Sequence, residues 1–365
     1  MTIAPRVTVL MTVYNGLPYL AQAVESVLAQ TLAVFELLII DDASTDESIR
    51  CLERYRDPRI RLFRNECNLG HVRSLNRGLS LCTSLYVARL DQDDSCYATR
   101  LERQVRFLDE HPQVAVVGSR MEGMDPSGRR GTGLLGHRLE NYGTFAASLL
   151  VGRCPLCHPS VMFRREVVGG LGGYDEDFAP AEDVELWMRM ALARHEAAVI
   201  PEPLVRHRLH PAQQSVTKAA RQQEQIWRSH TRILQTFGPP AHVAGLQHLL
   251  QRDSGVWNDY DSQARALELM QAFRALTETL QERLRMSELE RAAFTRVLDR
   301  WFGPGLRLAP AWGRWPSWAF YAGLWGLSPL LAPRVRPLAA RMAHPVRRAR
   351  EAIALVWADA KRRGA

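Results

Sequence analysis

Short apolar runs alternate with apolar residues at helical spacing over the first 120 residues. The runs have the length and the β-branched content of buried strands, and they lie at 7–11, 37–40, 60–63, 85–90 and 114–117. Between these runs, apolar residues recur at helical spacing, for example at 20, 24, 27 and 28, at 72, 75 and 79, and over 99–110. This alternation predicts an α/β fold with a mainly parallel sheet flanked by helices.

The pattern changes after residue 201. Residues 219–300 show long helical periodicity that is rich in Gln, Arg, Glu and Leu, with little strand character. From residue 301 the composition shifts again, to Trp, Pro, Gly and Arg. We therefore predict three parts: an α/β domain at 1–215, a helical extension at 216–300 and a distinct tail at 301–365.

Polar side chains follow three of the predicted strands where each strand ends. They are Thr12 and Tyr14, then Asp41 and Asp42, then Asp91, Asp93 and Asp94. In open α/β sheets, ligands bind at the carboxyl edge of the strands. Three polar clusters at that edge predict one shared binding site.

The third cluster carries the clearest chemistry. Asp91, Asp93 and Asp94 place three carboxylates within four residues. Their mutual repulsion is tolerable in open solvent or beside a cation, and oxygen ligands suit Mg²⁺ or Mn²⁺ shared with substrate phosphates. A solvated acidic turn is the alternative, but the position after a buried strand favours the cation site.

A second acidic pair, Glu182 and Asp183, precedes apolar residues at helical spacing. The pair is therefore predicted to begin a helix, where the helix dipole favours carboxylates. Simple capping of the helix would explain it. A general base that stays ionised and removes a proton from a hydroxyl is the functional interpretation. Likewise, Asp42 could bind a ribose or base and Tyr14 could stack on one, although each residue alone is more often structural.

Taken together and in order, these motifs resemble the family-2 glycosyltransferases, over roughly residues 5–215. The motifs are VLMTVYNG at 9–16, IDDASTD at 40–46, NLG at 68–70 with Asn76, LDQDD at 90–94, HPS at 158–160 and EDVELW at 182–187. The resemblance implies a Rossmann-like fold of the GT-A type, an inverting reaction and a divalent metal, and it makes 1–215 the catalytic domain.

The resemblance also implies roles for individual residues. Thr12, Tyr14 and Asp42 would hold the nucleoside, and Asn76 would belong to the same donor-binding set. Asp91 and Asp93 would form the DXD motif that holds the metal and the ribose-diphosphate, with Asp94 beside them. Asp183 would be the catalytic base. His210 stands where family members often carry a histidine that reaches the metal or the diphosphate, with His207 as a competitor and a surface histidine as the alternative for either.

Six cysteines include the pair Cys154 and Cys157 just before His158. The spacing suggests zinc or redox chemistry, but the chain has no second pair with metal-ligand spacing, so incidental thiols are favoured. Residues 1–6 lead into the first strand without a charged leader or a cleavage site. We therefore expect a cytoplasmic protein with free thiols.

The tail accounts for the basic character of the chain. The formal net charge is +8, whereas residues 301–365 carry eleven Lys or Arg and two acids, a sum of +9. Six of the nine tryptophans lie there. Aromatic residues beside arginines suit an anionic membrane surface, here the inner face of the plasma membrane. A membrane span and a helical hairpin packed on the catalytic domain are the alternatives. No recognised fold supports nucleic-acid binding.

The function that follows from the resemblance is transfer of a sugar from a nucleotide-diphosphate-sugar to a hydroxyl of a glycan or lipid-linked glycan acceptor, with Mn²⁺ or Mg²⁺, in cell-surface polysaccharide synthesis. Two alternatives remain. One is an inactive module that binds a nucleotide sugar. The other is a Mg²⁺-dependent phosphohydrolase, which the absence of any lysine before Lys218 disfavours.

Overall fold

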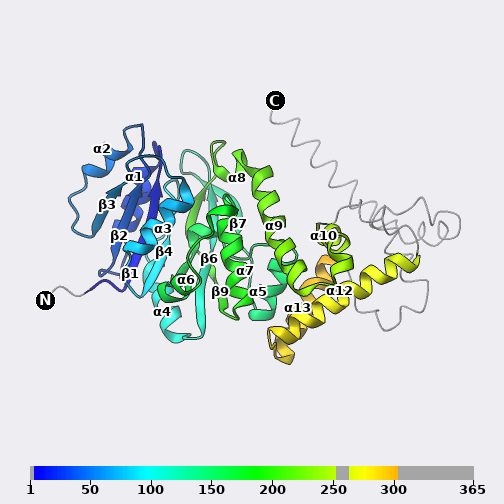
Figure 1. The fold of residues 1–365 in the computed structure, drawn as a ribbon. Coiled ribbons are helices and arrows are strands. Elements are labelled where there is room, and N and C mark those ends of the chain that lie inside the picture. Colours follow the sequence, from blue (N-terminus) through cyan, green and yellow to red (C-terminus); the bar gives the residue numbers. More distant parts are fainter. Residues whose placement is uncertain (1–3, 252–262, 303–365) are drawn as a thin grey trace.

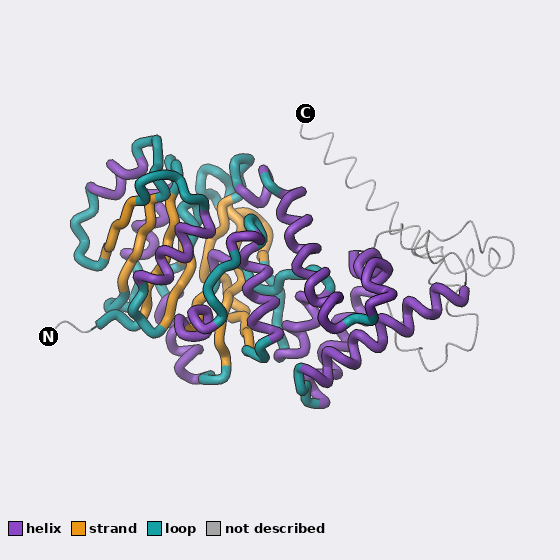
Figure 2. The backbone as a smooth tube through the Cα atoms, viewed as in Figure 1, coloured by secondary structure: helices purple, strands orange, loops and turns teal. Residues whose placement is uncertain are grey.

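The computed structural model describes residues 4–251 and 263–302, and it contains one nine-stranded sheet with helices on both sides (Figures 1 and 2). The strand order is β3-β2-β1-β4-β8-β6-β9-β5, and β7 pairs with β6. The strands are β1 Val7–Val13, β2 Glu36–Asp41, β3 Ile60–Arg64, β4 Tyr86–Arg89, β5 Ser95–Cys96, β6 Val114–Met124, β7 Arg130–Leu135, β8 Met162–Arg164 and β9 Glu196–Arg208.

Most strands run in the same direction. The pairs β1–β2, β2–β3, β1–β4 and β6–β9 are parallel. β8 is antiparallel to both β4 and β6, so β6 and β9 share the direction of β1 to β4. Only β5, β7 and β8 run the other way. The predicted α/β fold with a mainly parallel sheet is confirmed, and the carboxyl ends of β1, β2 and β4 meet at one edge.

Helices cover the two faces of the sheet because neighbouring strand residues point to opposite sides. Val9 and Leu37 pack with α1 and α4, whereas Leu10 and Leu38 pack with α3, α5 and α7. The helices of this part are α1 Leu20–Leu28, α2 Ser48–Glu53, α3 His71–Leu81, α4 Arg100–Glu110, α5 Tyr142–Leu150, α6 Arg165–Gly170, α7 Glu182–Leu192 and α8 Gln214–Thr217, with the 3-10 turns η1 His158–Ser160 and η2 Glu176–Phe178.

The helical extension continues the core of the α/β part. It consists of α9 Ala219–Phe237, the turn η3 Pro240–His242, α10 Val243–Gln251, α12 Gln263–Arg283 and α13 Glu288–Phe302. Phe273 and Phe294 belong to the same apolar cluster as Phe145 of α5. α13 lies directly on α5, since a Cβ added at Gly143 would come within 2.0 Å of the Glu290 carbonyl oxygen. The extension is thus packed against the α/β part (Figure 1).

The predicted membrane-binding tail lies outside the described residues, except for 301 and 302 at the end of α13. Within the described ranges, no helix combines the length and the apolar composition needed to cross a bilayer.

Candidate active site

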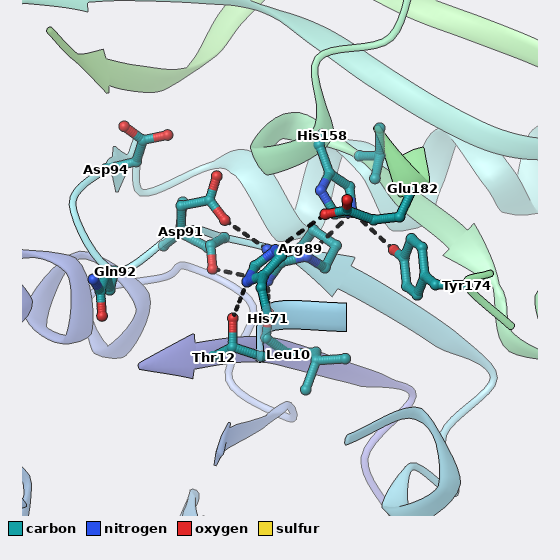
Figure 3. Close-up of polar contacts among 12 residues, drawn as sticks. Leu10, Thr12, His71, Arg89, Asp91, Gln92, Asp94, His158, Tyr174 and Glu182 are labelled. Carbon is teal, nitrogen blue, oxygen red and sulfur yellow. Dashed lines mark hydrogen bonds and ion pairs between the residues drawn. The ribbon is translucent and has the colours of Figure 1, made fainter. Parts of the chain in front are cut away.

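The three aspartates that follow β4 send their side chains in different directions. Asp91 turns back to Arg89, Asp93 turns to His210, and Asp94 binds the end of β9. Figure 3 shows Asp91 beside Arg89, with Asp94 well apart from both. The structure therefore divides the predicted acidic cluster into three separate contacts.

Arg89 is a fully buried cation at the end of β4. Its Nη2 donates to Asp91 Oδ1 at 2.6 Å, and its Nη1 donates to the Leu10 carbonyl at 2.6 Å. Burial is the largest single effect and disfavours the ionised form of Asp91. Arg89 and the neighbouring histidines His158, His71 and His207 together outweigh burial and lower the pKa of Asp91 below its usual value. Asp91 is therefore a carboxylate held ionised and in a fixed direction.

Asp93 and His210 form the second contact. Asp93 Oδ2 lies 2.8 Å from His210 Nε2, and the imidazole also lies against the Tyr19 ring, with 5.0 Å between ring centroids. Burial, and next the negative charge of Asp91, raise the pKa of Asp93. Asp91 and Asp93 are close enough for their charges to interact. Among the described residues, however, Asp91, Asp93 and His210 do not form a group of three whose ligand atoms all lie within 4.8 Å of one another.

Asp94 joins the acidic turn to β9. Its Oδ1 accepts from the Arg208 backbone N–H at 2.9 Å, and both carboxylate oxygens lie 3.1 Å from His207 Nδ1. Burial raises the pKa of Asp94 to about 6. Burial also disfavours the protonated form of His207. The contact with Asp94 acts in the opposite direction, and the pKa of His207 is raised overall. Asp94 and His207 thus bind each other, which takes His207 away from the other two acids.

Arg208 secures the same junction, and it was not among the predicted site residues. Its buried guanidinium donates to the Asp93 carbonyl at 2.9 Å and to the Pro126 carbonyl at 3.0 Å, and it lies over the Tyr19 ring, 4.4 Å from the centroid. Because His210 is two residues further on, these contacts fix the position of the histidine.

The residues predicted to hold the nucleoside lie at the same sheet edge but differ in accessibility. The Tyr14 side chain is 44% exposed. Its backbone N–H donates to Gln92 Oε1 at 2.9 Å, and Gln92 Nε2 donates to its carbonyl at 3.1 Å. Thr12 is buried, and its Oγ1 lies 3.1 Å from His71 Nδ1. Tyr14 is therefore the exposed ring of this group.

Asp42 and Asn76 are engaged by the protein itself. The buried Asp42 carboxylate accepts from Asn65 Nδ2 at 2.6 Å and from the backbone N–H groups of Leu69 and Gly70 at 2.8 and 2.9 Å. The Asn76 amide bonds both backbone groups of Tyr174, at 2.8 and 2.9 Å. In this structure Asp42 organises the loop before α3, and Asn76 positions the segment that leads to α7.

The predicted base lies in the first turn of α7, as expected. Asp183 is half-buried, and its Oδ1 accepts from the Val184 backbone N–H at 2.8 Å. Burial raises the pKa of Asp183 to about 6, and the negative charge of Asp91 adds to this rise. Its neighbour Glu182 is buried, which raises its pKa to about 7. A carboxylate with a pKa near 6 can accept a proton at neutral pH.

Sequence reasoning missed several residues that meet between the two acidic groups. His158 Nε2 lies 2.8 Å from Tyr174 Oη, and Arg89 Nε lies 3.4 Å from the same nitrogen. His71 Nε2 lies 3.5 Å from Glu182 Oε1 (Figure 3). One signal was available, because an arginine inside a predicted buried strand requires anionic or carbonyl partners.

The six cysteines are free thiols, as predicted. Burial raises the pKa of both Cys154 and Cys157 and so keeps them protonated. Among the described residues, neither thiol belongs to a group of three that could hold a metal ion.

The fold and the site together are a mainly parallel sheet with two carboxylates at its carboxyl edge and an acidic helix start at α7. The profile of the family described as "Glycosyl transferase family 2" matches residues 8–171. The chain is 37% identical over 194 residues to the putative glycosyltransferase EpsE of Bacillus subtilis, covering 52% of this chain and 68% of that protein. It is 31% identical over 206 residues to the amylovoran biosynthesis glycosyltransferase AmsE of Erwinia amylovora, covering 55% and 75%. The chain belongs to glycosyltransferase family 2.

Solved structures agree on the fold. TarS 1–349 of S. aureus in complex with UDP superposes with a TM-score of 0.52 at 18% identity, covering 85% of this chain and 93% of that one. The mannosyltransferase PcManGT of Pyrobaculum calidifontis, in complex with GDP-Man and Mn²⁺, gives a TM-score of 0.50 at 19% identity, covering 94% and 87%. At this identity the likeness concerns the fold alone.

Proposed function

We propose that this enzyme moves a sugar from a nucleotide-diphosphate-sugar to a hydroxyl of a glycan or lipid-linked glycan, with inversion at the anomeric carbon. The observation that carries the proposal is the position of two acidic groups at one edge of the sheet. Asp91 and Asp93 follow β4, and Asp183 lies in the first turn of α7, near enough for the charge of Asp91 to raise its pKa. One group suits a phosphate-bound cation, and the other suits a proton acceptor.

The donor would lie along the carboxyl edge of β1, β2 and β4. The exposed Tyr14 ring offers a surface on which a base can stack, and Thr12, Asp42 and Asn76 would complete the donor site. TarS has been solved with UDP and with UDP-GlcNAc, and PcManGT with GDP-Man. These ligands support a nucleoside diphosphate sugar without selecting the nucleoside.

The residues present fit a divalent cation. Asp93 is a half-buried carboxylate whose ionisation is opposed by burial and by Asp91, and a cation would relieve both effects. We propose that Asp91, Asp93 and His210 would hold Mn²⁺ or Mg²⁺. When bound, the ion supplies charge stabilisation for the departing diphosphate. PcManGT in complex with GDP-Man and Mn²⁺ supports this choice.

The proton would be removed by Asp183. Its carboxylate, ionised above a pKa of about 6, would accept the proton of the acceptor hydroxyl as that oxygen attacks the anomeric carbon. The attack comes from the side opposite the diphosphate, so one displacement inverts the centre. Asp94 faces β9 and would keep the acidic turn and His210 in register.

We further propose a role in cell-surface polysaccharide synthesis, on the cytoplasmic face of the plasma membrane. The name of AmsE, an amylovoran biosynthesis glycosyltransferase, supports the first part. The charge of +9 and the six tryptophans in the tail support attachment to an anionic surface. Sedimentation of the full chain with phosphatidylglycerol vesicles, but not with phosphatidylcholine vesicles, is the expected result. Equal sedimentation with both would contradict the attachment.

Thermal unfolding of the purified protein with UDP-, GDP- and CDP-sugars, each with and without Mn²⁺, tests the donor. We expect one nucleotide class to raise the melting temperature only with Mn²⁺, and Asp183→Asn should keep that shift while losing transfer. Loss of binding in this variant would make Asp183 a donor ligand instead. Binding without turnover on any acceptor would indicate an inactive module, and release of orthophosphate without sugar transfer would indicate a phosphohydrolase.

A further inference from the structure

Three metal-ligating side chains meet between the acidic turn and α7, each from the first residue of a helical element. They are His71 of α3, His158 of η1 and Glu182 of α7, and their candidate ligand atoms all lie within 4.8 Å of one another. Figure 3 shows the three side chains converging beside Arg89. None of the three is needed for the donor, cation or base roles proposed above.

We propose that His71, His158 and Glu182 form a second cation site, one that takes a divalent transition-metal ion of the zinc type. Two imidazoles and one carboxylate are a common ligand set for zinc, whereas Mg²⁺ prefers oxygen ligands alone. Three protein ligands leave one position of a tetrahedral site for water.

The carboxylate of Glu182 is the first support for this site. Glu182 is 6% exposed, and its Oε2 is enclosed without a hydrogen-bond partner among the described residues. Its Oε1 lies 3.5 Å from His71 Nε2, a long contact, and the backbone N–H of Glu182 also acts on the carboxylate. A buried carboxylate with an unpartnered oxygen is costly, and a cation between the carboxylate and the imidazoles would satisfy it.

The outer contacts of the two histidines are the second support. A histidine that binds a metal through one nitrogen usually bonds a protein group through the other. His71 Nδ1 lies 3.1 Å from Thr12 Oγ1, which leaves Nε2 directed at Glu182. His158 Nε2 lies 2.8 Å from Tyr174 Oη, a contact that fixes the orientation of the ring.

Charges of both signs surround the cluster. Burial and next the charge of Arg89 lower the pKa values of His71 and His158, so both imidazoles are neutral and can bind a metal. Arg89 Nε lies 3.4 Å from His158 Nε2, and Asp91 pairs with Arg89 through a 2.6 Å contact. Lys218 also acts on His71, although its side chain is exposed to solvent, and the carboxylates of Glu182 and Asp183 are the acidic groups on the other side of the balance.

An ion bound to these three residues would link the first residues of α3, η1 and α7. Since Glu182 precedes Asp183, an ion held there would fix the first turn of α7. If Asp183 is the base, which rests on the proposed function, the ion would fix the direction of the base. Binding of the ion itself does not depend on that assignment.

Zinc binding by the full chain tests the site. An Asp93→Asn/His210→Gln double variant removes the other proposed cation site and serves as the background. After treatment with a chelator, equilibrium dialysis against Zn²⁺ alone, followed by metal analysis, should give one bound equivalent. Adding His71→Gln should weaken zinc binding by at least about tenfold, because even outer-shell partners of a metal contribute about 10- to 100-fold. Equal affinity with and without His71 would overturn the proposal.

Control variants separate this site from other zinc ligands and from misfolding. Glu182→Gln should weaken binding as His71→Gln does, while His195→Gln, after the far end of α7, should not. Cys154→Ser/Cys157→Ser should retain the zinc, and loss of the zinc in this variant would assign it to the thiols and refute the site. Circular dichroism of each metal-free variant checks its fold. All measurements are made without nucleotide, so failure of this site and failure of the proposed transferase are distinguishable.

Discussion

The Asp93 carboxylate and the His210 imidazole meet across 117 positions of sequence, with 2.8 Å between Oδ2 and Nε2. The contact closes the acidic turn after β4 against the segment that follows β9. It places an imidazole nitrogen beside one of the carboxylates that we propose to bind a cation. The strength of donor binding should therefore depend on a residue far from the DXD motif.

Replacing His210 by Gln should weaken the Mn²⁺-dependent binding of the donor. The glutamine can still bond Asp93, but it lacks the imidazole nitrogen proposed to bind the cation. We expect the dissociation constant of the nucleoside diphosphate with Mn²⁺ to rise by about tenfold or more. Isothermal titration measures it, with His195→Gln as the control for the loss of a half-buried histidine elsewhere. Unchanged affinity in His210→Gln would remove this residue from the cation site.

Asp94 should act as a positioning residue, since its carboxylate binds His207 and the Arg208 backbone. An Asp94→Asn variant removes the negative charge that raises the pKa of His207, so that pKa should fall. NMR titration of the imidazole measures the change.

The same variant should also affect the donor, because His210 follows Arg208 by two residues. The Michaelis constant for the donor should rise more than the turnover number falls. Asp94→Glu keeps the negative charge but has a longer side chain. In this variant the pKa of His207 should return close to its wild-type value, while the Michaelis constant for the donor should recover less. A normal pKa of His207 in Asp94→Asn would show that the contact with Asp94 does not control the histidine.

Five buried strands, the mainly parallel sheet and the position of the acidic groups could be predicted from the sequence because their signals are local. The strand order and the strands β5, β7, β8 and β9 could not. Each buried strand is a continuous apolar run, and parallel strands deliver their following residues to one edge. That rule was enough to bring Thr12, Tyr14, Asp42 and Asp91 to the same edge of the sheet.

The direction of each side chain could not be predicted, because it depends on partners far away in the sequence. Asp94 looks like a member of the DXD cluster, yet β9 supplies its partners. Asp42 looks accessible at a strand end, yet the backbone of the loop before α3 binds its carboxylate. His71 has no local signal, because its meeting with Glu182 requires α3 and α7 to be packed side by side.

The contact between α5 and α13 gives a stability prediction for the helical extension. A Cβ at Gly143 would come within 2.0 Å of the Glu290 carbonyl oxygen and 2.7 Å of its carbon, both backbone atoms. Gly143→Ala should therefore destabilise the protein by about 1–3 kcal/mol, the usual cost of overpacking. The midpoint and slope of urea unfolding measure the change.

Gly169→Ala is the matched control for Gly143→Ala. Gly169 lies in α6, and a Cβ there would meet nothing within 4 Å. The change should be neutral or stabilising by up to about 1 kcal/mol, because alanine favours the helix. Equal destabilisation by the two variants would mean that the packing of α13 on α5 contributes little.

His230 should make the stability of the protein depend on pH. The side chain is fully buried in α9, its Nε2 donates to the Leu149 carbonyl at 2.7 Å, and burial lowers its pKa to about 4. The unfolded chain binds this proton near pH 6.5. Stability is therefore complete above that pH and falls towards pH 4, by up to about 1.4 kcal/mol per pH unit from this group.

A His230→Gln variant tests this assignment, because glutamine can still donate to the Leu149 carbonyl but does not titrate. At pH 7.5 the variant should be less stable than the wild type, because glutamine does not fill the buried space of the imidazole in the same way. Between pH 6 and 4.5 its free energy of unfolding should fall less steeply, so the difference between the two proteins should shrink as the solution becomes more acidic. Urea unfolding at a series of pH values measures both curves, and parallel curves would assign the acid sensitivity to other groups.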